Sequence, residues 1–260
     1  MGTDRDWEAW GQHDPYYGVL SSEDFRIDTL TAERKQAFFH SGEQHVDALL
    51  HTIRATFCRD FHPQRSLDFG CGVGRLLIPL AKHSVHATGI DVSPSMLAEA
   101  AHNCAEQRVH NVDLVSSDDS LSQAKGKYDL VNSHIVLAHI DSRRGHALIE
   151  ALAERVNLGG FIAVQVLYSC NAPRWERAIV RLRYRLPPLN ALRNLIRGRP
   201  FDEPAMQLHV YNLPVLLRML HGRGFGPVLM ISDAFENGQF DSVVLIAQRH
   251  TDDTRPMVAI

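Results

Sequence analysis

The chain has 260 residues, of which 45% are hydrophobic and 22% are charged, and its formal net charge is −3. This composition excludes disordered and collagen-like chains, and the charge gives no global reason to expect a nucleic acid or an anionic membrane as partner. Its apolar runs are far shorter than the roughly 20 residues that span a bilayer, and its acidic start is unlike a signal peptide. We therefore expect a cytoplasmic protein without stable membrane insertion.

The first 60 residues have a mainly helical pattern with an aromatic-rich start that includes Trp7, Trp10, Tyr16 and Tyr17. Such a start is unlike a disordered tail. We expect residues 1–60 to form a helical lid on the core. The flat rings either close over a ligand, with Tyr16 and Tyr17 as candidate acceptor or lid residues, or only anchor the lid.

Short apolar runs alternate with helical patterns from about residue 65 to residue 167, which is typical of βαβ units in a parallel sheet. The predicted strands cover residues 66–69, 85–90, 112–115, 128–132 and 161–166. Helices are predicted at 94–106, behind the N-cap Ser93, and at 142–156, before Gly159 and Gly160. Residues 61–167 are therefore expected to form the ligand-binding core.

Residues 168–205, which we call the arginine-rich segment, carry eight arginines against three acids. Two apolar helical faces lie on either side of the pair Pro187-Pro188 and predict an inserted helical cap. The apolar positions are Trp175, Ile179, Leu182 and Leu186, then Leu189, Leu192 and Ile196. The arginines have three candidate roles: a solvated charged face, a membrane-surface helix, or an entrance lined by guanidinium groups for an anionic acceptor.

Residues 206–250 are expected to complete the core, and residues 251–260 to form a tail. The predicted elements are a helix at 213–220 and antiparallel strands at 228–232 and 242–248, joined through Glu236, Asn237 and Gly238. The predicted fold class is α/β: a doubly wound, Rossmann-like, seven-stranded sheet, mostly parallel with a C-terminal antiparallel hairpin, plus the N-terminal lid and the inserted cap.

A glycine loop follows the first strand in the run Asp68-Phe69-Gly70-Cys71-Gly72-Val73-Gly74. Its Gly-x-Gly-x-Gly spacing and the preceding acid differ from the Gly-x-Gly-x-x-Gly of pyrophosphate binders. The bare backbone of Gly70 and Gly72 suits the ribose and amino-acid portions of a ligand, and Asp68 suits an ammonium group. Asp91, 19 residues after Gly72, ends the second strand, where a carboxylate can accept both ribose hydroxyls. The predicted ligand is a nucleoside.

The third strand ends in Ser116-Ser117-Asp118-Asp119. Either Asp118 or Asp119 is predicted to accept a hydrogen bond from an adenine amino group. The remaining predicted binding residues are Cys71, Gly74, Val92, Met96 and Ser133.

Together these residues resemble the class I methyltransferase superfamily: residues 68–74 look like its first motif, Asp91 like its second-strand acid, and residues 128–131 like its fourth strand. The resemblance covers about residues 60–170. It implies S-adenosyl-L-methionine as cofactor and S-adenosyl-L-homocysteine as product. Patterns in residues 10–17, 38–42 and 133–140 further resemble a bacterial branch acting on small molecules or saccharides, although Ala138 stands where such relatives often have glutamine.

Ser133, His134 and His139 follow the fourth strand, at the edge where doubly wound sheets bind ligands. In-line methyl transfer to a hydroxyl requires a base, and histidine titrates near neutral pH. We expect His139 to be the base, with His134 close behind; the alternative for His139 is a buried histidine bonded to backbone. His209 and Tyr211 are expected either to meet the acceptor or to pack in the core.

The expected activity is O-methylation of a small hydroxylated acceptor, with a saccharide or an anionic molecule among the candidates. N-methylation, a non-catalytic module that binds S-adenosylmethionine, and an NAD-dependent oxidoreductase are the alternatives. The four cysteines and fifteen histidines lack a familiar metal-ligand spacing, so no metal site is expected and a divalent cation is not indicated. No nucleic-acid partner is expected, and a homo-oligomer is compatible with the sequence.

Overall fold

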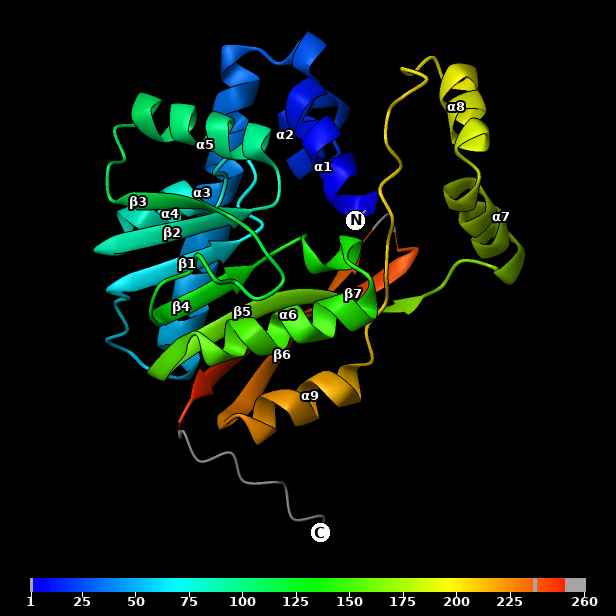
Figure 1. Ribbon diagram of the computed structural model, residues 1–260. Helices are drawn as coiled ribbons and strands as arrows, with labels where there is room; N and C mark the ends of the chain where they lie inside the picture. Colours follow the sequence, from blue (N-terminus) through cyan, green and yellow to red (C-terminus); the bar gives the residue numbers. More distant parts are fainter. Residues whose placement is uncertain (1, 236–237, 251–260) are drawn as a thin grey trace.

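A computed structural model describes residues 2–235 and 238–250 of the chain. Of the predicted hairpin connection, Glu236 and Asn237 lie outside the described residues, as does the predicted tail at residues 251–260. Figure 1 shows a central twisted sheet with helices on both faces and two further helices, α7 and α8, at the side of the molecule.

Within the described residues, seven strands form one sheet in the order β3-β2-β1-β4-β5-β7-β6 (Figure 1). The strands are β1 Arg65–Phe69, β2 His86–Asp91, β3 Val112–Ser116, β4 Tyr128–Ser133, β5 Val156–Cys170, β6 Phe225–Phe235 and β7 Phe240–Arg249. The pairs among β1 to β5 are parallel, whereas β7 is antiparallel to both β5 and β6. The predicted doubly wound α/β fold with a C-terminal antiparallel hairpin is confirmed.

The helices form a layer on each face of the sheet. They are α1 Gly2–His13, α2 Pro15–Val19, α3 Ala32–Thr56, α4 Leu77–Lys82, α5 Pro94–Glu106, α6 Ser142–Glu154, α7 Arg174–Arg185, α8 Pro187–Ile196 and α9 Leu213–Gly222, with short 3-10 turns η1 Glu23–Phe25, η2 Ile27–Thr29 and η3 Leu137–His139. Alternation along β4 explains the layers, because successive side chains of a strand point to opposite faces. Leu130 packs in a core cluster with α3 and α4, and Val131 packs in another with α6 and α9.

The boundary between α6 and β5 differs from the sequence prediction. The sequence pattern predicts a helix that reaches residue 156, but α6 ends at Glu154 and β5 starts at Val156. Val156 pairs with Tyr128 of β4, and the Arg155 guanidinium donates to the carbonyl oxygens of Leu121 and Ala124. Long-range pairing with β4 therefore ends the helix before the two glycines that follow it in the sequence.

The N-terminal helices lie beside the end of the sheet at which β1 to β4 finish (Figure 1). Helix α1 packs on α5, where the Glu8 carboxylate accepts hydrogen bonds from the Ser93 and Ser95 hydroxyls, each at 2.7 Å. Glu8 thus sits at the start of α5, whose exposed N–H groups favour a negative charge. Helix α1 and the strand ends of the sheet together surround the site described next.

Candidate functional site

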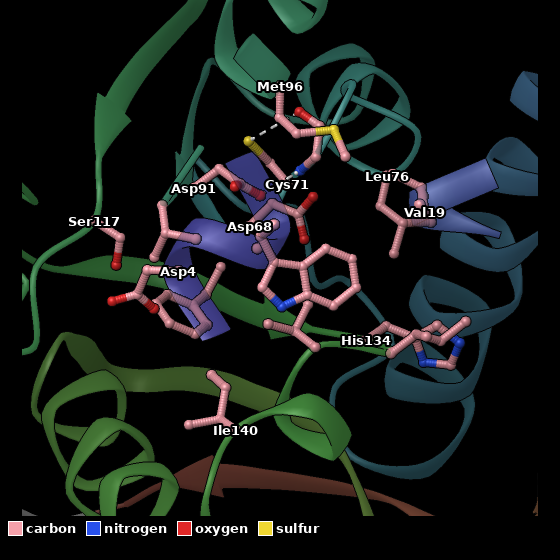
Figure 2. Close-up of a pocket in the computed structure, with 18 of the residues that line it drawn as sticks. Asp4, Val19, Asp68, Cys71, Leu76, Asp91, Met96, Ser117, His134 and Ile140 are labelled. Carbon is pink, nitrogen blue, oxygen red and sulfur yellow. Dashed lines mark hydrogen bonds between the residues drawn. The ribbon is translucent and has the colours of Figure 1, made fainter. Parts of the chain in front are cut away.

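A pocket lies where the parallel strands end (Figure 2). Four of the residues that line it stand at or just after the ends of these strands. Gly70 follows β1, Asp91 ends β2, Ser117 follows β3 and His134 follows β4. The space between its lining atoms is about 890 Å³, and this includes open solvent. The edge at which the parallel strands of a doubly wound sheet end is the usual place for a small ligand.

The glycine loop depends on backbone conformations that other residues rarely adopt. Gly70, Gly72 and Gly74 have φ values of +75°, +51° and +91°. Space is also restricted, because a Cβ on Gly70 would lie 2.3 Å from a methyl carbon of Val136, and one on Gly72 would lie 2.6 Å from a methyl carbon of Val19. The loop therefore presents bare backbone to the pocket.

Asp91 is tied to the glycine loop through its carboxylate. One oxygen accepts the Gly72 N–H at 2.9 Å and the other accepts the Ser93 N–H at 2.9 Å. Burial raises the pKa of Asp91, and these two hydrogen bonds oppose the rise. A carboxylate offers about four acceptor positions, so two remain for hydroxyl groups of a ligand.

Asp68 is 2% exposed and accepts a hydrogen bond of 2.8 Å from the Asn132 amide of β4. Burial raises its pKa to about 7, although the hydrogen bond and the charge of Arg75 oppose this. Arg75 is 6% exposed, lines the same pocket, and has an Nε with no hydrogen-bond partner among the described residues. The pocket is thus lined by a buried acid, Asp68, and a buried cation, Arg75, whose Nε makes no hydrogen bond within the described residues.

His134 lies at the same end of the pocket, and its ring centroid is 4.0 Å from that of His45, which comes from α3. Burial lowers the pKa of His45 to about 4, and burial together with the charges of His45 and Arg75 lowers the pKa of His134 well below its ordinary value. Both imidazoles are therefore neutral at pH 7. A neutral imidazole keeps one nitrogen lone pair as a proton acceptor.

His139 occupies a different position. It is 6% exposed in η3, its Nδ1 lies 2.9 Å from the Gln207 carbonyl oxygen, and its ring packs edge-on against Trp7 at 5.0 Å. Because a carbonyl oxygen only accepts, Nδ1 carries the proton. Burial lowers the pKa of His139 to about 4. It lines a small second hollow with Trp7 and Gln207, outside the pocket of the glycine loop.

His209 and Tyr211 hold the loop that carries His139. The His209 N–H donates to the Ala138 carbonyl at 2.7 Å, and the Tyr211 hydroxyl lies 2.9 Å from the carbonyl oxygens of Leu137 and Ile140. Burial raises the pKa of Tyr211 and lowers that of His209. Neither residue lines the pocket. Tyr211 packs in the core, as one alternative from the sequence has it, whereas His209 is half-buried and belongs to no core cluster of the described residues.

The predicted adenine acceptors both lie outside the pocket lining. The Asp118 carboxylate accepts hydrogen bonds from Ser120 and Ser122 in its own turn, which lower its pKa to about 2. Asp119 binds Arg144 at 2.7 Å. Ser117, the residue before them, lines the pocket instead. The adenine role of either acid stays a prediction.

The remaining predicted binding residues divide in the same way. Cys71, Val92 and Met96 line the pocket, whereas Gly74 and Ser133 do not. Ser133 is buried, and its hydroxyl has no hydrogen-bond partner among the described residues. Burial raises the pKa of Cys71.

Tyr16 and Tyr17 do not line the pocket either. The Tyr16 hydroxyl lies within hydrogen-bond distance of Glu99 and Asn103 of α5, and the Arg26 guanidinium stacks on the Tyr17 ring at 3.4 Å. Both rings therefore anchor the N-terminal helices.

Trp7 belongs to the aromatic-rich start that the sequence singled out, but several other pocket residues were not predicted. From α1, Thr3, Asp4 and Trp7 line the pocket, and Figure 2 labels Asp4 among them. Asp4 pairs with Arg144 of α6 at 2.7 Å. Arg75 has a signal in the sequence, since it directly follows the last glycine of the loop. His45 and Arg144 have none, because each reaches the site from a helix distant in sequence.

The chain is similar in sequence to known methyltransferases. Residues 67–160 match the family model described as a methyltransferase domain. A ubiquinone biosynthesis O-methyltransferase from Erwinia tasmaniensis is 30% identical over 172 residues, which are 64% of this chain and 67% of that protein. The protein of the same name from Cronobacter sakazakii is 31% identical over 122 residues, 46% of this chain but only 49% of that protein, so about half of its length is matched.

Among solved structures, the magnesium protoporphyrin IX methyltransferase from Synechocystis with bound SAM aligns with a TM-score of 0.57. The alignment covers 95% of this chain and 98% of that one, at 19% sequence identity. At this identity the likeness concerns the fold.

Proposed function

The chain belongs to the class I S-adenosylmethionine-dependent methyltransferases, and from this membership we propose that it transfers a methyl group from S-adenosylmethionine to a hydroxyl group of a small molecule. The observation that carries the proposal is the shared pocket formed by the glycine loop, Asp91, Arg75 and His134. In this pocket the glycine loop and Asp91 suit a nucleoside, Arg75 suits a carboxylate, and His134 suits the removal of a proton.

The residues of this pocket fit the donor. Asp91 has acceptor positions left for two ribose hydroxyls. Arg75 lines the pocket and its positive charge suits the donor's carboxylate, and the buried Asp68 suits its ammonium group. When bound, the donor supplies an electrophilic methyl group on a sulfonium sulfur. Val92 and Met96 offer the apolar surface against which the adenine ring can pack.

His134 is the residue that we assign to proton removal, with His139 as the alternative. His134 lines the donor pocket, whereas His139 lines the neighbouring hollow and holds its Nδ1 proton on the Gln207 carbonyl. Burial keeps His134 neutral, so its free lone pair can accept a proton from an acceptor hydroxyl. The His45 ring lies against the His134 ring, with 4.0 Å between the ring centroids and a tilt of 44° between the planes.

The N-terminal helices serve as a lid over the pocket, and residues 61–167 with 206–250 form the core beneath it. Support comes from Thr3, Asp4 and Trp7, which line the pocket from α1. Two polar contacts hold the lid closed, Glu8 on Ser93 and Asp4 on Arg144. An enclosed pocket excludes water from the reacting atoms and strengthens the electrostatic interactions inside it.

The names of the relatives favour oxygen as the methylated atom, because the Erwinia and Cronobacter proteins are both O-methyltransferases. N-methylation is the alternative, since an amine acceptor needs less help from a base. A saccharide acceptor, a cytoplasmic location and a homo-oligomer remain predictions. No described helix is long and apolar enough to cross a bilayer.

The experiment is a screen for S-adenosylhomocysteine formation with phenols, sugars and amines as acceptors. We expect turnover with one hydroxylated class, and loss of that turnover in His134→Ala with unchanged affinity for S-adenosylmethionine. Thermal shifts with S-adenosylhomocysteine and with NAD identify the ligand that the pocket binds. A shift with NAD alone would favour an oxidoreductase, and donor binding without turnover on any acceptor would favour a non-catalytic module.

A further inference from the structure

The helices α7 and α8 of the arginine-rich segment expose an unusual amount of apolar surface. Of the seventeen large hydrophobic side chains exposed in the described part of the chain, ten lie between residues 168 and 201. Trp175, Leu195 and Ile196 are 66%, 69% and 77% exposed. Figure 1 shows both helices at the side of the molecule, away from the sheet. The apolar faces that the sequence predicts are thus not buried against the core.

Polar side chains of the same helices point the other way. The Asn190 and Asn194 amides of α8 donate to the Glu203 carbonyl oxygen at 3.0 and 2.9 Å, and the Tyr184 hydroxyl of α7 donates to the Met206 carbonyl. A surface helix of a globular protein normally buries its apolar stripe and exposes its polar one. Here the polar stripe holds the helices to the returning chain and the apolar stripe faces outward.

The charge of the segment is opposite to that of the rest of the protein. Residues 168–205 have a surplus of five positive charges, and because the whole chain carries −3, the remaining residues carry −8. Of the three acids in the segment, Glu203 is 9% exposed and is paired with Arg26 and Arg199. The segment therefore differs from the rest of the chain in the sign of its net charge, which is positive.

We propose that the exposed apolar face of α7 and α8 docks the protein on the surface of an anionic lipid bilayer, with both helices lying in the headgroup region. Apolar side chains that enter the acyl boundary and arginines that meet anionic headgroups are the two contributions that hold an interfacial helix. The alternative occupant, a second copy of this chain, is disfavoured because a twofold interface brings the same basic surface against itself. The inference does not depend on the reaction that the pocket performs.

Sedimentation of the full chain with vesicles tests the proposal. We expect binding to vesicles of equal parts phosphatidylcholine and phosphatidylglycerol, little binding to phosphatidylcholine alone, and release when salt is raised to about 1 M, where screening acts within about 3 Å. Trp175 is a built-in probe: its emission should shift to the blue on binding, and Trp175→Phe should abolish the shift.

Matched variants separate the apolar and the charged contributions. Ile196→Gln should weaken partitioning at least about tenfold, whereas Val85→Gln, which removes an apolar side chain of 66% exposure elsewhere, should leave it unchanged. Arg197→Gln should weaken it about fivefold, and Arg59→Gln, outside the segment, should not.

Three results would overturn the proposal. The first is equal binding to anionic and neutral vesicles, and the second is an equal effect of the Val85 and Ile196 substitutions. The third is a wild-type dimer in light scattering that becomes a monomer in Ile196→Gln, with no vesicle binding by either protein. That last outcome would assign the face to self-association.

Discussion

Replacing Asp91 with alanine should weaken S-adenosylmethionine binding without unfolding the protein. The two carboxylate oxygens each accept one backbone N–H at 2.9 Å, from Gly72 and Ser93, and about two acceptor positions remain for ribose hydroxyls. Hydrogen bonds to a charged group contribute about 1.5 to 3 kcal/mol each. Loss of one ribose contact should therefore raise Kd roughly ten- to a hundredfold, and loss of both should raise it by about a hundredfold or more.

The same substitution also removes the two contacts inside the protein. Leaving the Gly72 and Ser93 N–H groups without their partner should lower the free energy of unfolding by about 1 to 3 kcal/mol. Burial, which raises the pKa of Asp91, offsets part of this loss, because a buried charge is removed at the same time. Urea unfolding without ligand measures this contribution separately from affinity.

Calorimetric titration with S-adenosylmethionine and S-adenosylhomocysteine is the assay. Asp91→Asn, which keeps one carbonyl oxygen but loses the charge, should fall between wild type and alanine. Asp113→Ala is the matched control, since Asp113 is an acid of the next strand whose carboxylate contacts only His86 among the hydrogen bonds of the described residues. A folded Asp91→Ala protein with a Kd within about twofold of wild type would refute the placement of the nucleoside, because that change is well under 1 kcal/mol.

His134→Ala should lower kcat by about 10² to 10⁴ and leave the Kd of the donor unchanged, whereas His139→Ala should lower kcat less. If steady-state kinetics showed the larger loss in His139→Ala, His139 would be the base. Donor binding should favour ionised Asp68 and release a proton, so Kd should fall as pH rises from about 5 to about 7, the pKa of that acid in the free protein. Asp68→Asn should flatten this pH dependence in calorimetry, and a steep profile in that variant would contradict the assignment. Gly70→Ala should lower the free energy of unfolding by about 2 to 4 kcal/mol, through its positive φ and the contact with Val136. Val136→Ala added to it should restore part of the loss in urea unfolding, and an unaffected single variant would argue against the crowding of the loop.

The sheet and the donor loop could be predicted because their signals are local. Each predicted strand overlaps an observed one, and the positive φ values of Gly70 and Gly72 are what the glycine spacing indicates. Asp91 lies beside the loop because parallel strands end at one edge of the sheet, a rule that needs no knowledge of side-chain packing. The ends of helices and strands were less well predicted where pairing between distant strands decides them. The pairing of Val156 with Tyr128, which ends α6 early, is the example.

The tertiary structure alone decided which distant side chains meet. His45 meets His134 because α3 packs against the sheet, and neither residue carries a sequence signal for the other. Packing also placed His139 in a separate hollow, against Trp7. The same holds for the arginine-rich segment. The helical periodicity of its apolar residues predicts an apolar face around Trp175, but only the fold decides that this face is exposed. Sequence determines backbone conformation and local pattern, whereas proximity between elements depends on how whole surfaces pack together.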